Sequence, residues 1–457
     1  MNVRFLVVGL TVLGLAGCVS YAPKPLPRHV ALPQSASAIL VEPTQLPFYG
    51  LSSHPFNPDD GLDMDEVAML AVANNPQLRQ ARDSLNVARA QSFAAGLLPD
   101  PQLGATSDHP TNGTAGNTNS FNFNLNYDVN ALLLRSSRKG AAQAQAQRVN
   151  LDLLWQEWQV VSQARLLFTR LTAQQALMGQ LQAAHNLLAE RYRRSQQALT
   201  AGNVTLDLVS ADLVALQNIK RQINELERSR LQNRASLNGL LGLLSTTPLE
   251  LVGEPRAALI DAAAVQSGLV ERLNQRPDLQ ALQAGYRSQE EKFRGAVLAQ
   301  FPALNIGLTR ARDTSGLYTM GFGLTMSLPI FNRNRGNIAI ENATRTQLFD
   351  AYQDRLNSAY SEVAIALENQ PLLQSQLHRT RAGEQQLQIV AQRAQAAFQA
   401  GNLTAADYVR LQTALLDKQT EAINLQEALM EQQIALEILL GPGLPAQADN
   451  RRTNNAP

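Results

Sequence analysis

Ala201-Gly202-Asn203-Val204-Thr205 recurs 199 residues later as Ala400-Gly401-Asn402-Leu403-Thr404. A duplicated unit of about 200 residues is predicted, because other phrases recur in the same order and internal repeats constrain a fold before local patterns do. The recurring phrases have offsets between 199 and 201: Asn75-Pro76-Gln77-Leu78 with Arg276-Pro277-Asp278-Leu279, Pro101-Gln102-Leu103 with Pro302-Ala303-Leu304, and Leu240-Leu241-Gly242 with Leu439-Leu440-Gly441.

The composition favours long helices packed on one another. Ala, Leu and Gln dominate the 457 residues, and aromatic residues make up only 5%. Lys and Arg number 39 against 38 Asp and Glu. The chain therefore lacks the basic excess that marks a nucleic-acid-binding protein.

Residues 1–17 are predicted to be an export signal, with Arg4 before an apolar core. Leu15-Ala16-Gly17-Cys18 resembles the lipobox of bacterial lipoproteins, in which the Cys thiol carries lipid such as palmitate after cleavage. Cys18 is the only Cys in the chain, so no internal disulfide forms; the alternative is an incidental Cys after a plain signal peptide. By resemblance to bacterial lipoproteins, Val19 in place of Asp favours sorting to the outer membrane, which implies a lipid-anchored protein with a large periplasmic part.

Beyond the signal, no stretch has the ~18 apolar residues of a transmembrane helix. Any crossing of a membrane by the mature chain would therefore need a closed β-barrel, because lipid offers the backbone no hydrogen bonds. Residues 18–60 contain many Pro residues and are expected to form an extended arm. Asp63 then opens a helix with Asp65 and Glu66 in its first turn.

Two segments alternate apolar and polar residues with the period of a β-strand. In Phe121–Val129 the odd positions are apolar, and in Tyr318–Leu328 the even positions are bulky. Each follows a shorter partner, at 102–107 and 303–310, so each repeat offers one hairpin. These lengths suit a tilted transmembrane strand, although a half-buried hairpin of a soluble sheet would alternate in the same way.

Four strands are too few to close a barrel in lipid, since single-chain barrels begin at about eight strands. If the strands lie in lipid, the chain must share a barrel with copies of itself, and three copies would supply twelve strands.

Long helices are expected to fill the rest of each repeat. Apolar residues step by seven at Leu154, Val161 and Phe168, and again at Leu181 and Leu188, which is typical of coiled-coil packing. Breaks are expected only at the two Gly-Asn pairs, and Pro371 should kink or interrupt its helix.

The predicted organisation has six parts. They are the signal peptide 1–17; the arm 18–60; a first repeat 61–245 with strands about 101–130 and helices about 136–200 and 206–242; a linker 246–258; a second repeat 259–442 with strands about 303–330 and helices about 338–400 and 405–440; and a flexible tail 443–457.

These features together resemble the outer-membrane factor family, the TolC-like channels of tripartite efflux pumps. The match extends over residues 62–442, and its most specific stretch is Leu328-Pro329-Ile330-Phe331-Asn332-Arg333-Asn334-Arg335-Gly336-Asn337-Ile338, which looks like the family's entry from the last strand into a periplasmic helix. The residues Asn332 to Asn337 of this stretch favour the heavy-metal branch of the family. The corresponding stretch of the first half is 127–140, with Arg138-Lys139-Gly140 at the strand–helix junction.

The resemblance implies a mainly α fold with a small transmembrane β part: a trimer with a twelve-stranded β-barrel on a periplasmic α-barrel. It implies that the helix breaks contact a periplasmic adaptor, the membrane fusion protein; alternatively they are plain turns. The adaptor-contact residues would be Gly202, Asn203, Val204 and Thr205, and Gly401, Asn402, Leu403 and Thr404.

The family closes its periplasmic end just after the second break. Asp407 and Arg410 are the candidates here, and they could pair with each other or reach a neighbouring protomer; Asp207 is weaker. Arg410 stands where many members have an acid, so a purely acidic ring is not expected. A solvated helix surface is the alternative for these residues.

The sequence contains no recognisable catalytic, cofactor or metal motif: the five His are scattered, and no phosphate loop or nucleophile motif occurs. The expected function is a passive exit duct for drugs or metal ions, fed by an inner-membrane pump; the family resemblance implies a pump of the RND type. A duct for type I protein secretion and a pore-free periplasmic scaffold lipoprotein are the alternatives. The sequence does not identify the substrate or the pump.

Overall fold

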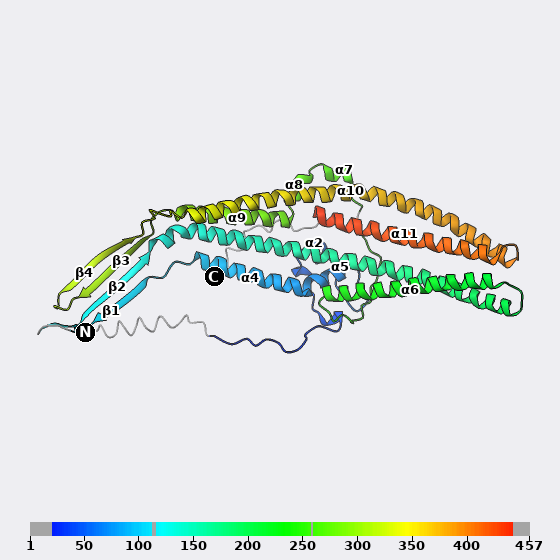
Figure 1. Ribbon diagram of the computed structural model, residues 1–457, viewed down its shortest axis with the longest axis horizontal. Coiled ribbons are helices and arrows are strands. Elements are labelled where there is room, and N and C mark those ends of the chain that lie inside the picture. The colour runs from blue at the N-terminus through cyan, green and yellow to red at the C-terminus, as the bar shows by residue number, and fades with distance from the viewer. Residues whose placement is uncertain (1–20, 112–115, 257–258, 442–457) are drawn as a thin grey trace.

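The computed structural model describes residues 21–111, 116–256 and 259–441. The molecule is elongated, with a β-sheet at one end and two long helical hairpins that run from it to the other end (Figure 1). Each half of the chain supplies one β-hairpin and one helical hairpin. The mainly helical fold with a small β part agrees with the sequence prediction.

The sheet has four antiparallel strands in the order β1-β2-β3-β4. Its register aligns Leu103 with Leu125, Leu125 with Leu308 and Leu308 with Phe322. Bulky side chains of all four strands therefore lie on one face, while Asn, Gly and Thr lie on the other. The strands are β1 Gln102–Asp108, β2 Ser120–Asp128, β3 Leu304–Arg312 and β4 Tyr318–Met326.

Two pairs of long helices form the body of the molecule: α5 Val129–Thr200 with α6 Leu206–Leu240, and α10 Arg335–Gln399 with α11 Ala405–Leu440. With 72 residues, α5 is about 110 Å long at 1.5 Å per residue. It is the central helix, because α6, α11, α4 (Pro76–Gly96) and α9 (Pro277–Leu298) all pack on it.

The seven-residue steps lie in the helix contacts as expected. Val161, Phe168, Leu181 and Leu188 are all buried, whereas Leu154 is only half-buried. Burial of a large apolar side chain contributes about 1.5–3 kcal/mol, so this stripe stabilises the long α5 against its neighbours.

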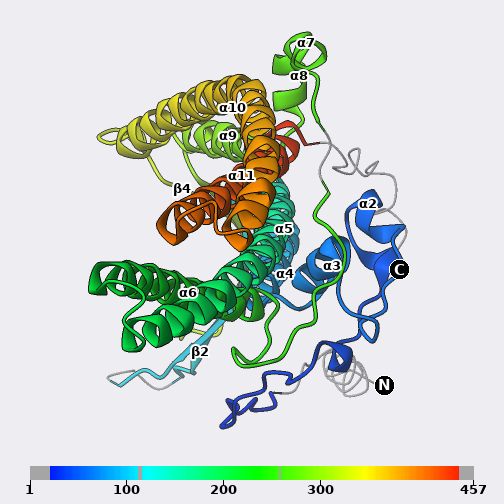
Figure 2. The same ribbon diagram turned by 90° about the vertical axis from the view of Figure 1, so that its right-hand side faces the viewer.

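Short elements lie beside the middle of the long helices (Figure 1), and the view along the long axis places α2, α3, α7 and α8 on one side of the two helical hairpins (Figure 2). Most of the arm up to residue 47 is exposed, but Phe48 and Leu51 are buried, and the Phe48 ring lies 5.0 Å from that of Trp158. Asp63 caps α3 with a complete capping box. The short elements are η1 Ala36–Ala38, η2 Pro43–Gln45, α2 Tyr49–Ser52, α3 Met64–Asn74, α7 Ala262–Gln266 and α8 Leu269–Asn274.

Two of the recurring segments contact each other within each repeat. Asn75 donates from Nδ2 to the carbonyl of Leu240 at 2.8 Å, and Arg276 donates from Nη1 to the carbonyl of Leu439 at 3.4 Å. Both side chains thus satisfy the C-terminal end of the returning helix, where carbonyls lack partners. Arg276 is fully buried, paired with Asp278 at 2.8 Å, so the two repeats close the same contact with different chemistry.

The prediction for the first strand–helix junction is wrong. Arg138, Lys139 and Gly140 lie inside α5, which begins at Val129 directly after β2. The helix starts early because the Asp128 carboxylate accepts a hydrogen bond from the amide of Ala131 at 3.0 Å and caps the first turn. In the second half, residues 327–334 separate β4 from α10.

Pro371 does not interrupt its helix, since α10 runs continuously from Arg335 to Gln399. Proline removes one backbone hydrogen bond, but tertiary bonds hold the helix on both sides. Gln370 donates from Nε2 to the carbonyl of Ile260 at 2.9 Å, and Gln432 donates to that of Ala366 at 2.9 Å.

Across residues 21–441, apart from the short stretches 112–115 and 257–258, no helix is both long and apolar enough to cross a membrane.

Candidate functional site

The two helix breaks lie together at the end of the molecule opposite the sheet (Figure 1). Their turns are the same: Gly202 has φ 74° and Gly401 has φ 77°. The amide of Asn203 donates to the carbonyl of Ala198 at 2.8 Å, and that of Asn402 donates to that of Ala397 at 2.8 Å. These are the bonds of a helix-ending turn that needs a left-handed residue, which explains the Gly.

The surfaces of the two turns are also alike. The Gly and the Asn are exposed at both turns, while Val204 and Leu403 are half-buried. A Cβ added at either Gly would meet no atom within 4 Å. Thr205 and Thr404 are exposed and stand at the N-cap of the next helix. The turns therefore present one repeated surface of exposed polar groups around a small apolar residue.

The residues after the two turns differ. Thr404 Oγ1 accepts from the amide of Asp407 at 3.1 Å, and Arg410 Nη2 lies 2.7 Å from Asp407 Oδ1. The expected i,i+3 pairing within the chain is thus present. Thr205 makes no side-chain cap, and Asp207 is exposed one position out of register with Asp407. Since the Arg410 side chain is 79% exposed, the Asp407–Arg410 pair lies open to solvent.

The hairpins also contain two contacts that sequence reasoning missed. The rings of Phe398 and Tyr408 stack at 5.0 Å across the second turn. In the first hairpin, Arg191 Nε lies 2.7 Å from Asp212 Oδ1, with side chains only 10% and 2% exposed. Each charge follows a buried apolar residue by three positions, Leu188 and Val209, so a charge within an apolar stripe on both helices was the available signal.

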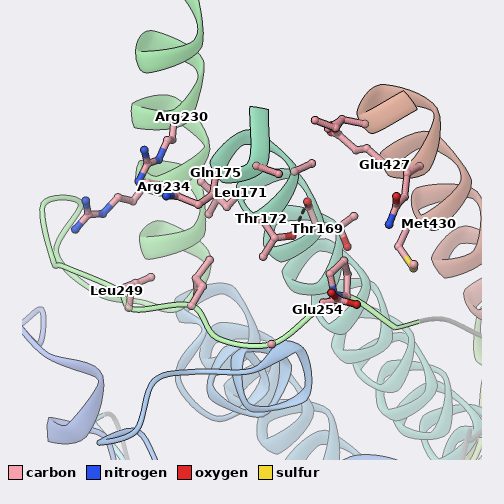
Figure 3. A pocket seen from close by; sticks show the side chains of 17 residues that line it. Thr169, Leu171, Thr172, Gln175, Arg230, Arg234, Leu249, Glu254, Glu427 and Met430 are labelled. Carbon is pink, nitrogen blue, oxygen red and sulfur yellow. Dashed lines mark hydrogen bonds between the residues drawn. The ribbon is translucent and has the colours of Figure 1, made fainter. Parts of the chain in front are cut away.

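A crevice of about 680 Å³ lies between the hairpins, at the level of the linker (Figure 3). Arg230 and Arg234 project from α6 on one side, and Glu427 and Met430 from α11 on the other. Glu254 comes from the linker segment that follows Leu249. The crevice therefore combines guanidinium groups, carboxyl groups and an apolar lining.

The α11 wall of the crevice carries a carboxyl group with a shifted pKa. Burial raises the pKa of the Glu427 carboxyl, and the nearby negative charge of Glu431 raises it further, against the opposing effect of Arg170. Arg170 itself pairs with Glu431, with Nε 2.5 Å from Oε1. The hydroxyls of Thr169 and Thr172 donate to carbonyls of their own helix at 2.9 and 3.0 Å.

Among the residues that the structure describes, no three His, Cys, Asp or Glu side chains gather closely enough to hold a metal ion. The predicted lipidation site Cys18 lies outside the described residues, as do the signal 1–17 and the tail 443–457.

A family model described as "Outer membrane efflux protein" matches residues 268–442, which lie within the second repeat. Among curated relatives, the chain is 27% identical over 405 residues to the "Cation efflux system protein CusC" of Escherichia coli strain K12, covering 82% of this chain and 85% of the relative. It is 24% identical to the "Probable outer membrane lipoprotein SilC" of Salmonella typhimurium, covering 95% of this chain and 97% of the relative.

Solved structures share the fold. A crystal structure of CusC superposes with a TM-score of 0.71 at 19% identity, covering 92% of this chain and 100% of that one. The CmeC outer membrane channel of Campylobacter jejuni superposes with a TM-score of 0.72 at 18% identity, covering 94% and 96%. The similarity extends over both repeats, although the family model matches only within the second.

Proposed function

The chain belongs to the outer membrane efflux protein family, and from this premise we propose that it is the passive outer-membrane exit duct of a tripartite efflux system. Substrate would enter from an inner-membrane pump through a periplasmic adaptor. The protein performs no chemistry of its own in this proposal.

The observation that carries the proposal is the two-faced sheet with two open edges. Its apolar face suits lipid and its Asn, Gly and Thr face suits water. Within the part of the chain that the structure describes, β1 and β4 have no strand on their outer sides. Open edges are not tolerated in lipid. Pairing β4 of one copy with β1 of the next keeps the antiparallel order, and three copies supply the twelve strands of a barrel.

The helical hairpins continue the duct into the periplasm. Since α5 and α10 follow the strands and α6 and α11 return beside them, three copies supply twelve helices for a tunnel. A tunnel lined by helix surfaces imposes little substrate specificity, because it offers a wet path rather than a closed pocket.

The turns at the far end form the adaptor surface in this proposal. The duplication repeats the Gly202–Thr205 surface at Gly401–Thr404, so a trimer presents six similar turns. Asp407 and Arg410 are assigned to the gate, and Asp207 to a lesser role there, because Asp407 and Arg410 form an ion pair in the first turns of the helix that follows the second break. Cys18 is assigned to lipid attachment after removal of residues 1–17.

Metal ions or drugs are the proposed cargo, moved by a pump of the RND type. The name of CusC refers to cation efflux, whereas OpmQ of Pseudomonas putida is named for pyoverdine export. The relatives therefore support small solutes as a class and leave the choice between them to experiment.

Deletion of the gene tests this proposal most simply. The deletion strain should become more sensitive to copper, silver or drugs, and the intact gene should restore resistance. A Cys18→Ser variant should lose radiolabelled palmitate. Unchanged sensitivity to every solute, together with a defect in the release of a secreted protein, would favour a type I secretion duct instead.

A further inference from the structure

The apolar face of the sheet carries two arginines at one end. Arg310 pairs in register with Phe123 and Met320, and Arg312 pairs with Phe121 and Tyr318. Both arginines therefore lie on the face of the bulky side chains. The strand positions that share this face include no Asp or Glu.

Neither guanidinium has a counter-ion within the described residues. Arg312 donates from Nη2 to Thr118 Oγ1 at 2.8 Å, and its guanidinium carbon lies 5.6 Å from the centre of the Tyr318 ring. Its Nε is enclosed and makes no hydrogen bond in the described part of the chain. Arg310 is exposed. Two positive charges thus stand side by side at the hairpin end of the sheet without neutralisation.

The depth of these two charges in the membrane follows from the energetic cost of placing arginine in lipid. An arginine on the lipid face of a barrel costs about 2–4 kcal/mol at the bilayer midplane but only about 0–1 kcal/mol near the interface. With the sheet in lipid, Arg310 and Arg312 therefore lie at the headgroups on the side of the hairpin loops, which is the outer leaflet because the helices run from the opposite end.

A second set of arginines lies at the depth where the lipid-facing apolar band of the sheet is expected to end. A strand tilted by about 40° advances about 2.5 Å per residue along the membrane normal, so an apolar band of about 25 Å takes about ten residues. Counted along β4 from Met320, the partner of Arg310, the band ends near Ile330. Phe331, 92% exposed, follows there, and the exposed Arg333 and Arg335 come next. Arginines thus bracket the apolar band at both ends.

We propose that Arg310 and Arg312 form a binding site for the phosphate group of an anionic lipid in the outer leaflet. The exposed guanidinium fork of Arg310 provides donors that match phosphate oxygens. The half-buried Arg312, which is bonded to Thr118, adds a second positive charge. The rings of Phe121 and Tyr318 lie where aromatic side chains contact the acyl boundary. The site rests on the proposed function, because it requires that the sheet face lipid.

The test counts lipids retained by the full-length protein. The wild type and the Arg310→Gln/Arg312→Gln variant are reconstituted in vesicles of phosphatidylcholine with phosphatidylglycerol, extracted in mild detergent and examined by native mass spectrometry. The variant should lose preference for phosphatidylglycerol by about thirtyfold, the factor expected from two arginines near a membrane surface. Equal preference in the two proteins would overturn the site.

Three controls separate the explanations. Arg393→Gln removes an exposed α10 charge with no ion pair in the described residues and should leave lipid retention unchanged. Arg310→Lys/Arg312→Lys should retain part of the preference, because charge remains without the bidentate fork. Inorganic phosphate should not displace the lipid; displacement would assign the site to free phosphate instead.

Failure of the site can be told from failure of the proposed function. Wild type and double variant should form trimers of equal stability in phosphatidylcholine and conduct ions equally. A double variant that loses its trimer there would show that a neighbouring copy, rather than lipid, holds the arginines. A wild type that neither inserts nor conducts would overturn the proposed function and the site with it.

Discussion

The two helical hairpins end in the same turn but are held together differently. In the first, the buried Arg191–Asp212 pair joins α5 to α6. Counted from the matching turns, Val390 and Leu411 occupy these positions in the second hairpin. The second is joined by the Phe398–Tyr408 stack and by hydrogen bonds from Thr380 to Glu421 and from Arg381 to Gln426, whereas its solvent-exposed Asp407–Arg410 pair lies within α11.

Both copies of the duplicated unit therefore keep the residues that the turn geometry requires, whereas the contacts between their helices differ. A buried ion pair is costly to open, because each charge would be left unpaired in a medium that solvates it poorly. An exposed pair exchanges readily with water. We therefore infer that the first hairpin is the stiffer docking element and that the second is the one that moves.

The largest expected effect follows removal of one buried charge. Asp212→Ala leaves the Arg191 guanidinium buried without its partner and should destabilise the first hairpin by about 3–5 kcal/mol. Hydrogen exchange of α5 and α6 peptides in the purified protein measures it. The Arg191→Val/Asp212→Leu variant installs the side chains of the second hairpin and should recover most of the loss. Equal exchange in both variants would refute the buried-pair account.

Bulky residues at the two turns should act through the backbone alone. Gly202→Val and Gly401→Val place a branched residue at positive φ, which costs about 1–2 kcal/mol or more each, while no neighbouring atom would clash. Both should weaken binding of the adaptor in pull-down assays and leave the trimer intact. Gly→Asn at the same sites, which tolerates this conformation, should bind nearly normally; full binding by the Val variants would remove the adaptor assignment.

The Phe398–Tyr408 stack should contribute less to the stability of its hairpin than the buried ion pair does to the first. Tyr408→Val installs the residue of the first hairpin, Val209, and should cost about 1 kcal/mol from the lost ring contact. Faster hydrogen exchange confined to residues 390–415 would measure it. Val209→Ala in the first hairpin serves as the control, since its effect should remain near residues 195–215. A uniform change in exchange over both hairpins would contradict the inference that each hairpin is held by its own contacts.

The exposed ion pair should matter for conductance more than for stability. Arg410→Gln should change the free energy of unfolding by about 0.2–1 kcal/mol, the usual range for surface pairs. If the second hairpin is the gate, single-channel recordings should show more frequent opening. Arg221→Gln, which breaks the exposed Arg221–Glu225 pair of the first hairpin, should leave opening unchanged, and identical recordings from both variants would remove Arg410 from the gate.

The pH dependence of the second hairpin gives the smallest effect. Glu427, which stands where the first hairpin has Arg228, has a pKa raised by burial. The folded state therefore holds its proton to higher pH than the unfolded state, and this stability is lost as pH rises through the raised pKa. Glu427→Gln should flatten the melting temperature across that range. A steeper dependence in the variant would show the sign to be wrong.

Local patterns predicted the turns and strands because their causes lie within a few residues. A Gly at positive φ, followed by a Thr at the N-cap position of the next helix, specifies each turn, and strict alternation specifies each strand. The start of α5 was missed because the cap by Asp128 decides it, and the strand pattern continued through that residue. Of the two effects expected of Pro371, a kink or an interruption, the interruption is absent, because Gln370 and Gln432, bonded to distant segments, support the helix.

The pairing of Arg191 with Asp212 depends on how two antiparallel helices align, so neither residue alone identifies it. The chemistry of the crevice depends likewise on segments far apart in sequence, since Arg230, Glu254 and Glu427 come from three elements. The features that could be predicted from the sequence were those determined by residues close together along the chain.

Conductance of the purified protein in a planar bilayer tests the central claim most directly. A trimer, established by mass in detergent, should insert and give discrete ion-conducting steps, with the Arg410→Gln variant open more often than the wild type. A chain that stays monomeric in detergent and gives no conductance would contradict the duct and favour a periplasmic scaffold.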